Sequence, residues 1–131
     1  MSNQIVLIVE DNPGNSELLA FILSSAGYEV RTAIDAEDAL KALQSFQPDL
    51  ILMDIGLPGV DGLELTRQLK SKPTTWDIPI LAVSAYAMKG DAERGREAGC
   101  DGYITKPVDV RALPQIVANY LGSRTQTPPV A

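Results

Sequence analysis

The sequence predicts one α/β domain in which five parallel strands are covered by helices on both faces. Two observations predict this fold. Short apolar runs alternate along the chain with segments of helical periodicity, and the alternation repeats five times. The runs also lack polar alternation, which is typical of parallel strands buried on both faces. At 131 residues, the chain is about the size of a single domain.

The first third of the chain predicts two strands and two helices. Ile5–Val9 is the first expected strand and Tyr28–Ala33 the second. Between them, an apolar stripe predicts a helix that stops at Gly27, a typical C-cap. The stripe consists of Leu18, Leu19, Ile22, Leu23 and Ala26. Asp35 is the expected N-cap of the second helix, with Asp38 three residues on in the place of the usual Glu.

The rest of the chain continues the alternation. The third strand, Leu50–Met53, is expected to run into Asp54, the fourth covers Ile78–Val83 and the fifth covers Gly102–Thr105. Pro79 is tolerated at a strand start, where no N–H is needed. The third helix carries Leu63, Leu65, Thr66 and Leu69, and the inward face of the last helix carries Val110, Leu113, Ile116, Val117, Tyr120 and Leu121.

The fourth expected helix, Lys89–Ala98, has unusually few apolar anchors. Ala92 and Ala98 are the ones within it, and Gly95 costs roughly 1 kcal/mol relative to alanine. Weakly anchored elements are those that change position or local order, although a solvated edge helix has the same pattern. The folded domain is expected to span residues 1–121, and residues 122–131 to form a disordered tail.

The composition excludes several kinds of chemistry. The chain has no histidine, which removes Ser-His and Cys-His nucleophile pairs, and its one cysteine, Cys100, rules out an internal disulfide and a Cys-based zinc cluster. A net charge of −6 opposes non-specific binding to nucleic acid or anionic membranes. The apolar runs are too short to span a membrane, and Met1–Gln4 lacks the basic region of a secretory signal. A cytoplasmic protein is expected.

Polar residues end four of the expected strands. Glu10 and Asp11 follow the first strand, Asp54 the third, Ser84 the fourth, and Lys106 lies just after the fifth. Ligands of open parallel sheets bind beyond the C-terminal strand ends, so these groups are expected to converge. Clustered carboxylates repel one another unless a hard cation lies between them, and oxygen ligands alone predict Mg²⁺. The set suits phosphoryl transfer onto Asp54, with Lys106 and Ser84 holding the incoming anion.

Four stretches resemble the receiver domains of two-component response regulators, which have the fold of the chemotaxis CheY type. They are Val9–Asn12, Leu52–Gly59, Ala82–Ala85 and Lys106–Pro107. The resemblance runs from about Ile5 to Leu121 and is greatest to the single-domain DivK-type receivers. It implies a doubly wound, flavodoxin-like sheet with strand order 2-1-3-4-5.

The resemblance also implies roles for individual residues. Asp54 is the implied phosphoacceptor, and Glu10 and Asp11 are the acidic pair for Mg²⁺, with the backbone carbonyl of Gly56 as a further ligand. Glu10 stands where aspartate is common in the family.

Three further residues resemble the switch machinery of receivers. Ser84, where threonine is common, corresponds to the switch hydroxyl, and Tyr103 to the aromatic residue coupled to it. Lys106 corresponds to the phosphate-binding lysine and implies a cis bond to Pro107. Gly56 and Tyr86 occupy positions implied to tune the lifetime of the phosphoaspartate.

The implied function is a signalling switch rather than an enzyme, since it catalyses only its own phosphorylation and dephosphorylation. The implied partners are a sensor histidine kinase or histidine phosphotransfer protein, which docks near Asn15 and Leu18, and a downstream effector protein. The effector surface is implied to comprise the fourth helix, the fifth strand and the last helix, including Tyr103.

Other interpretations of the same residues remain. A phosphatase of the haloacid-dehalogenase type carries a second Asp two residues after the nucleophile, where this chain has Gly56, and a flavodoxin-like cofactor site needs a Ser/Thr/Gly-rich loop in place of Asp11–Gly14. A degenerate receiver that serves only for docking would not need its acids, lysine and hydroxyl. Each polar residue also has a structural alternative; for Tyr103 it is plain packing at a strand end.

Overall fold

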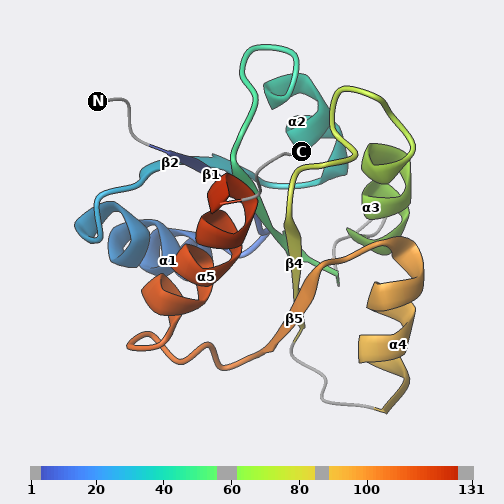
Figure 1. Ribbon diagram of the computed structural model, residues 1–131. Coiled ribbons are helices and arrows are strands. Elements are labelled where there is room, and N and C mark those ends of the chain that lie inside the picture. Colours follow the sequence, from blue (N-terminus) through green and yellow to red (C-terminus); the bar gives the residue numbers. More distant parts are fainter. Residues whose placement is uncertain (1–3, 56–61, 85–88, 127–131) are drawn as a thin grey trace.

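The computed structural model describes residues 4–55, 62–84 and 89–126, and its centre is one sheet of five parallel strands (Figure 1). The strands are β1 (Ile5–Val9), β2 (Glu29–Ala33), β3 (Leu50–Asp54), β4 (Ile80–Ser84) and β5 (Gly102–Thr105). They pair in the order β2-β1-β3-β4-β5. This is the order of the flavodoxin-like doubly wound fold, so the predicted fold class and strand order are confirmed.

In the described part of the chain, five helices connect and cover the strands. They are α1 (Pro13–Ser25), α2 (Ala36–Ala42), α3 (Gly62–Lys70), α4 (Lys89–Ala98) and α5 (Leu113–Gln126). One core lies between the sheet and α1 and α5, and a second lies between the opposite face and α2 and α3. Successive residues of β3 illustrate the division, because Leu50 and Leu52 belong to the first core and Ile51 and Met53 to the second.

Helix termini follow the expected capping chemistry. Gly27 has a φ of 101°, the conformation that favours glycine after a helix. The Asp35 carboxylate accepts the Asp38 N–H at 2.8 Å as the N-cap of α2. The Asp38 carboxylate in turn accepts the N–H of Ile34, the residue before the N-cap, so the two aspartates bind backbone N–H groups on both sides of the helix start.

Two strands begin later than expected, because the N–H groups of the residues before them form hydrogen bonds outside the sheet. β4 begins at Ile80 rather than Ile78, because the Ile78 N–H donates to Thr75 in the preceding turn. β2 begins after Tyr28, whose N–H donates to Leu23 at the end of α1. The competing hydrogen bonds remove both residues from the sheet.

Two predictions about helix faces were wrong. Leu18 is 49% exposed, whereas Leu19 and Leu23 of the same helix are buried in the core against the sheet. Val110 precedes α5 and is 42% exposed. The last helix, α5, ends at Gln126, and residues 127–131 of the expected tail lie outside the described residues. Among the described helices, none has both the length and the apolar character needed to cross a membrane.

The two leucines Leu52 and Leu18 provide a matched test of this core. Leu52 is 1% exposed in β3, so Leu52→Ala leaves a cavity and should lower the free energy of unfolding by about 2–5 kcal/mol. The control Leu18→Ala removes a half-exposed side chain and should cost less than about 1 kcal/mol. Urea denaturation monitored by circular dichroism measures both, and equal losses would contradict the assigned core.

Candidate functional site

The C-terminal ends of four neighbouring strands bring the predicted polar residues together. Glu10 follows β1, and its N–H donates to the Ala33 carbonyl at 2.9 Å. Asp54 and Ser84 are the last residues of β3 and β4. Lys106 follows β5, and its N–H donates to the Ser84 carbonyl at 2.7 Å. The sheet therefore places all of these groups at one edge.

Three carboxylates form the centre of this edge. Glu10, Asp11 and Asp54 each offer one oxygen, and these oxygens all lie within 4.8 Å of one another. Glu10 is 3% and Asp54 7% exposed, whereas Asp11 is open to solvent. Oxygen donors with an open side fit Mg²⁺, which keeps some of its water ligands. Gly56, the further ligand implied by the sequence, lies outside the described residues.

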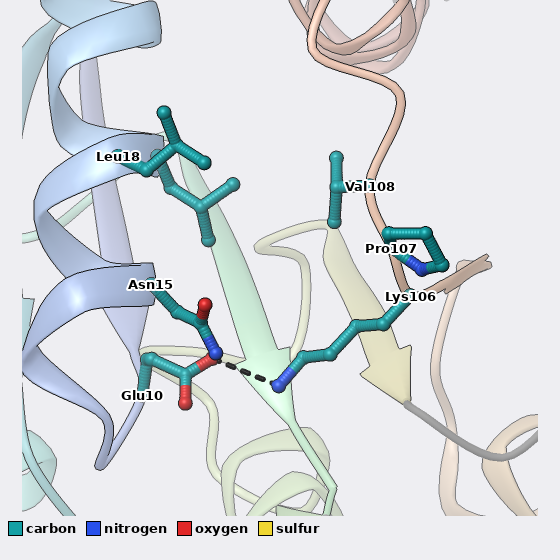
Figure 2. Close-up of a pocket in the computed structure, with 7 residues that line it drawn as sticks. Glu10, Asn15, Leu18, Lys106, Pro107 and Val108 are labelled. Atoms are coloured by element: carbon teal, nitrogen blue, oxygen red, sulfur yellow. Dashed lines mark hydrogen bonds and ion pairs between the residues drawn. The ribbon is translucent and has the colours of Figure 1, made fainter.

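The Lys106 ammonium lies between two of the carboxylates. It donates to Glu10 Oε1 at 3.1 Å and to Asp54 Oδ2 at 3.2 Å, and its side chain is 20% exposed. Figure 2 shows the side chain reaching from the end of β5 to Glu10. One cation from a distant part of the sequence thus offsets the charge of residues that end two other strands.

Burial and charge change the proton affinity of this pair. Burial raises the pKa of the Glu10 carboxyl, and hydrogen bonds from the Asn12 N–H and from Lys106 offset part of the rise. For Lys106, burial lowers the pKa, but the hydrogen bond to Glu10 and the charge of Asp54 outweigh burial, so the pKa lies above its usual value. The ammonium therefore stays protonated at neutral pH.

Ser84 and Tyr103 share one face of the sheet. Ser84 is 3% exposed and is aligned with Thr105 on β5, while Tyr103 is half-buried and aligned with Ala82 on β4. Because side chains alternate along a strand, these four residues lie on the same side. That side is opposite to the α1 and α5 core, which contains the intervening Val83 and Ile104. Tyr86 lies outside the described residues.

A cavity of about 450 Å³ opens beside the Lys106–Glu10 pair. It lies between α1 and the segment that follows β5, with the charged pair at one end and aliphatic side chains at the other (Figure 2). Its lining includes Asn15, Leu18, Pro107 and Val108. The Lys106–Pro107 peptide bond is cis, as the resemblance implied.

Gly62, at the start of α3, is a site residue that sequence reasoning missed. A Cβ added there would overlap the carbonyl oxygen of Asp54 and lie 2.7 Å from the Ile55 Cα. α3 thus begins directly against the end of β3, an approach that only glycine permits. The available signal was a glycine at the first turn of a helix after a buried strand, but the sequence did not reveal what it touches.

Asn12 also supports the site, in two ways. Its N–H donates to Glu10 Oε2 at 3.2 Å, while its side-chain oxygen accepts the Asn15 N–H at 3.0 Å and caps α1. The residue therefore links the orientation of an acidic side chain to the start of a helix.

Residues 6–118 match the family of response regulator receiver domains. The chain belongs to this family. A curated relative, the polar-differentiation response regulator DivK of Brucella anthropi, is 45% identical over 117 residues, which are 89% of this chain and 95% of the relative. The chain is thus a response-regulator receiver domain similar to DivK.

Solved receiver structures have the same fold. A response regulator from Chloroflexus aurantiacus is 36% identical with a TM-score of 0.89, covering 92% of this chain and 99% of its own. The receiver domain of a sensor histidine kinase from Pseudomonas aeruginosa is 35% identical with a TM-score of 0.84, again covering 92% and 99%. That structure has a magnesium ion coordinated in its active-site cleft.

The contact at Gly62 predicts a specific sensitivity of the site. Gly62→Ala should displace the end of β3 or the start of α3, lowering both the free energy of unfolding and the affinity for Mg²⁺. Gly95→Ala in α4 is the matched control, because its Cβ would lie no closer than 3.8 Å to its neighbours. Urea denaturation and a magnesium titration followed by NMR measure both quantities. Normal magnesium binding by Gly62→Ala would contradict this role.

Proposed function

We propose that this receiver domain accepts a phosphoryl group on Asp54 in a Mg²⁺-dependent reaction and then signals through protein–protein interaction. The main support is the juxtaposition at one sheet edge of a nearly buried Asp54, two further carboxylates within 4.8 Å and the Lys106 ammonium at 3.2 Å. An aspartate alone is a poor nucleophile toward a phosphoryl group, because both carry negative charge. The surrounding groups reduce that repulsion.

In the proposed reaction, a phosphohistidine of a partner protein is the donor. An Asp54 carboxylate oxygen attacks the phosphorus atom, the P–N bond breaks as the O–P bond forms, and the histidine nitrogen keeps the electron pair. The products are a phosphoaspartate and a neutral histidine. If the other ring nitrogen carries no proton, the departing nitrogen takes one from water. Lys106 and Ser84 hold phosphoryl oxygens and thereby orient the group for attack.

The residues that would hold Mg²⁺ are Glu10, Asp11 and Asp54, with the carbonyl of Gly56. When bound, Mg²⁺ supplies positive charge that offsets the charge of the phosphoryl oxygens. The longer side chain of Glu10, compared with aspartate, lets its carboxylate contact both the Asn12 N–H and Lys106 while facing the site.

The switch in this proposal lies on the side of the sheet shared by Ser84 and Tyr103. A phosphoryl group that draws the Ser84 hydroxyl toward it changes the packing available to Tyr103, which alters the surface formed by α4, β5 and α5. Water attack on the phosphoaspartate resets the switch, so the domain catalyses only its own modification. The functional unit is proposed as residues 1–121.

The phosphoryl donor is proposed to dock over α1. The cavity lined by Asn15 and Leu18 leads to Lys106 and Glu10, and the half-exposed Leu18 gives this approach an apolar contact. A sensor histidine kinase or a histidine phosphotransfer protein is the proposed donor, a downstream effector protein the proposed receiver of the signal, and the cytoplasm the proposed location.

Intact mass after incubation with acetyl phosphate and Mg²⁺ tests the phosphoacceptor. The wild type should gain one phosphoryl group, and Asp54→Asn should gain none, since an amide cannot act as the nucleophile. Asp77→Asn is the control, because this exposed aspartate precedes β4 at the opposite edge of the sheet and should leave labelling unchanged. Equal labelling of Asp54→Asn would remove Asp54 from its proposed role.

Thermal unfolding in a magnesium titration tests the metal site separately. Mg²⁺ at ten times its dissociation constant should stabilise the folded protein by about 1.4 kcal/mol, because the ion binds the assembled carboxylates and not the unfolded chain. Asp11→Asn should lose most of this gain and still fold, since Asp11 is exposed. An unchanged titration curve for Asp11→Asn would assign the metal to other residues.

A further inference from the structure

The part of helix α4 whose side chains are described, residues 93–98, is held to the molecule by few apolar groups. Among its described side-chain positions, 93–98, Gly95 and Ala98 are buried and the others are exposed. Neither buried residue extends beyond a Cβ. Burial of apolar area is the main source of packing free energy, so this stretch of α4 gains little from its contact with the sheet.

Gly95, in the middle of α4, has no side chain to contact Ala82 and Cys100, which lie beside it. A Cβ added at Gly95 would lie 3.8 Å from both the Ala82 Cβ and the Cys100 Sγ, which is ordinary van der Waals contact. Alanine would therefore fit and would also favour the helical conformation. With glycine at position 95, the helix packs against β4 with fewer contacts than alanine would make in the same space.

The C-terminal end of α4 is, by contrast, firmly fixed. Gly99 has a φ of 107°, its N–H donates to the Arg96 carbonyl at 3.0 Å, and the Cys100 N–H donates to Gly95 at 2.9 Å. These bonds form a Schellman ending. The stem of Lys70 from α3 lies over this turn, since a Cβ at Gly99 would come within 2.8 Å of the Lys70 Cγ.

Asp101 joins this turn to three other elements. Its carboxylate Oδ2 accepts the Lys70 ammonium at 2.9 Å and the Ile80 N–H of β4 at 2.9 Å. Its N–H donates to the Ile80 carbonyl at 2.7 Å, and its own carbonyl accepts the Tyr120 hydroxyl of α5 at 3.3 Å. The turn is thus tied to α3, β4 and α5.

The Lys70 ammonium makes three hydrogen bonds around this turn. Besides Asp101, its ammonium donates to the carbonyls of Ile78 at 2.8 Å and Trp76 at 3.1 Å, so all three protons have acceptors. The Lys70 side chain is 18% exposed and that of Asp101 41%, so the ammonium is largely covered while the carboxylate also faces solvent. The backbone segment before β4 and the turn after α4 are held by one cation.

We propose that Lys70 and Asp101 form a fixed pivot for α4, about which the beginning of the helix moves when Asp54 is phosphorylated. The trigger rests on the function proposed above. The helix begins five positions after Ser84, at the phosphorylation edge of the sheet, and ends at the Lys70–Asp101 pair near the opposite edge. Figure 1 shows α4 beside α3, with its end leading into β5. Because contacts hold the C-terminal end of α4 and its middle packs weakly, a displacement of its N-terminal end should rotate the helix rather than translate it.

Hydrogen exchange in the unphosphorylated, metal-free protein tests the pivot by itself. Amides of residues 99–101 should be protected at least tenfold more than those of 93–96, and Lys70→Met should remove this difference while keeping the stem over Gly99. Lys72→Met, at an exposed lysine, is the matched control. Asp101→Asn is a second variant that keeps an acceptor for the Ile80 N–H and lacks the ion pair. Unchanged protection in both Lys70→Met and Asp101→Asn would overturn the proposal.

Beryllofluoride with Mg²⁺, a phosphoryl mimic, then tests the motion. In the wild type, amide NMR shifts at 89–94 should exceed those at 99–101 at least threefold, and Gly95→Ala should reduce the shifts at 89–94. Shifts of equal size along the helix would overturn the pivot. A complete lack of response to beryllofluoride would instead contradict the proposed function, and the exchange pattern of the unphosphorylated protein would be unaffected by that result.

Discussion

The contact of the Lys106 ammonium with Glu10 and Asp54 is the interaction on which the site depends. The two carboxylates end adjacent strands, β1 and β3, and are nearly buried, so their mutual repulsion needs a cation. Lys106 follows β5, which lies two strands from β3, or roughly 10 Å across the sheet. A long, flexible side chain is therefore required, and lysine supplies it with a compact charge at its tip.

The sheet and helix α4 have opposite physical properties. Every side chain of β3 is buried, which fixes the end of that strand and hence Asp54. The described part of α4 buries only a glycine and an alanine, and polar contacts hold it at one end. In the proposed switch, rigid packing under Asp54 and weak packing under the described part of α4 would allow a local change of charge to alter a surface without unfolding the core.

Much of the fold and the site could be predicted from the sequence, because the responsible patterns are local. Unbroken apolar runs identify buried parallel strands, and the polar residues that end them, such as Asp54 and Ser84, identify the sheet edge at which the candidate site lies. Predictions were wrong where an apolar residue has more than one possible neighbour. Leu18 belongs to the apolar stripe that predicts α1, yet it is 49% exposed. Periodicity counts apolar positions and does not say which of them face the sheet.

The sequence by itself determined the order of strands and helices along the chain, the chemical groups at the strand ends and the glycine that ends α1. Only the tertiary structure decided that Gly62 lies against the Asp54 carbonyl, that one lysine contacts both Glu10 and Asp54, and that Asp101 joins α3, β4 and α5. The physical reason is distance along the chain. Capping and strand formation depend on neighbouring residues, whereas these contacts depend on how crossover helices pack across the sheet.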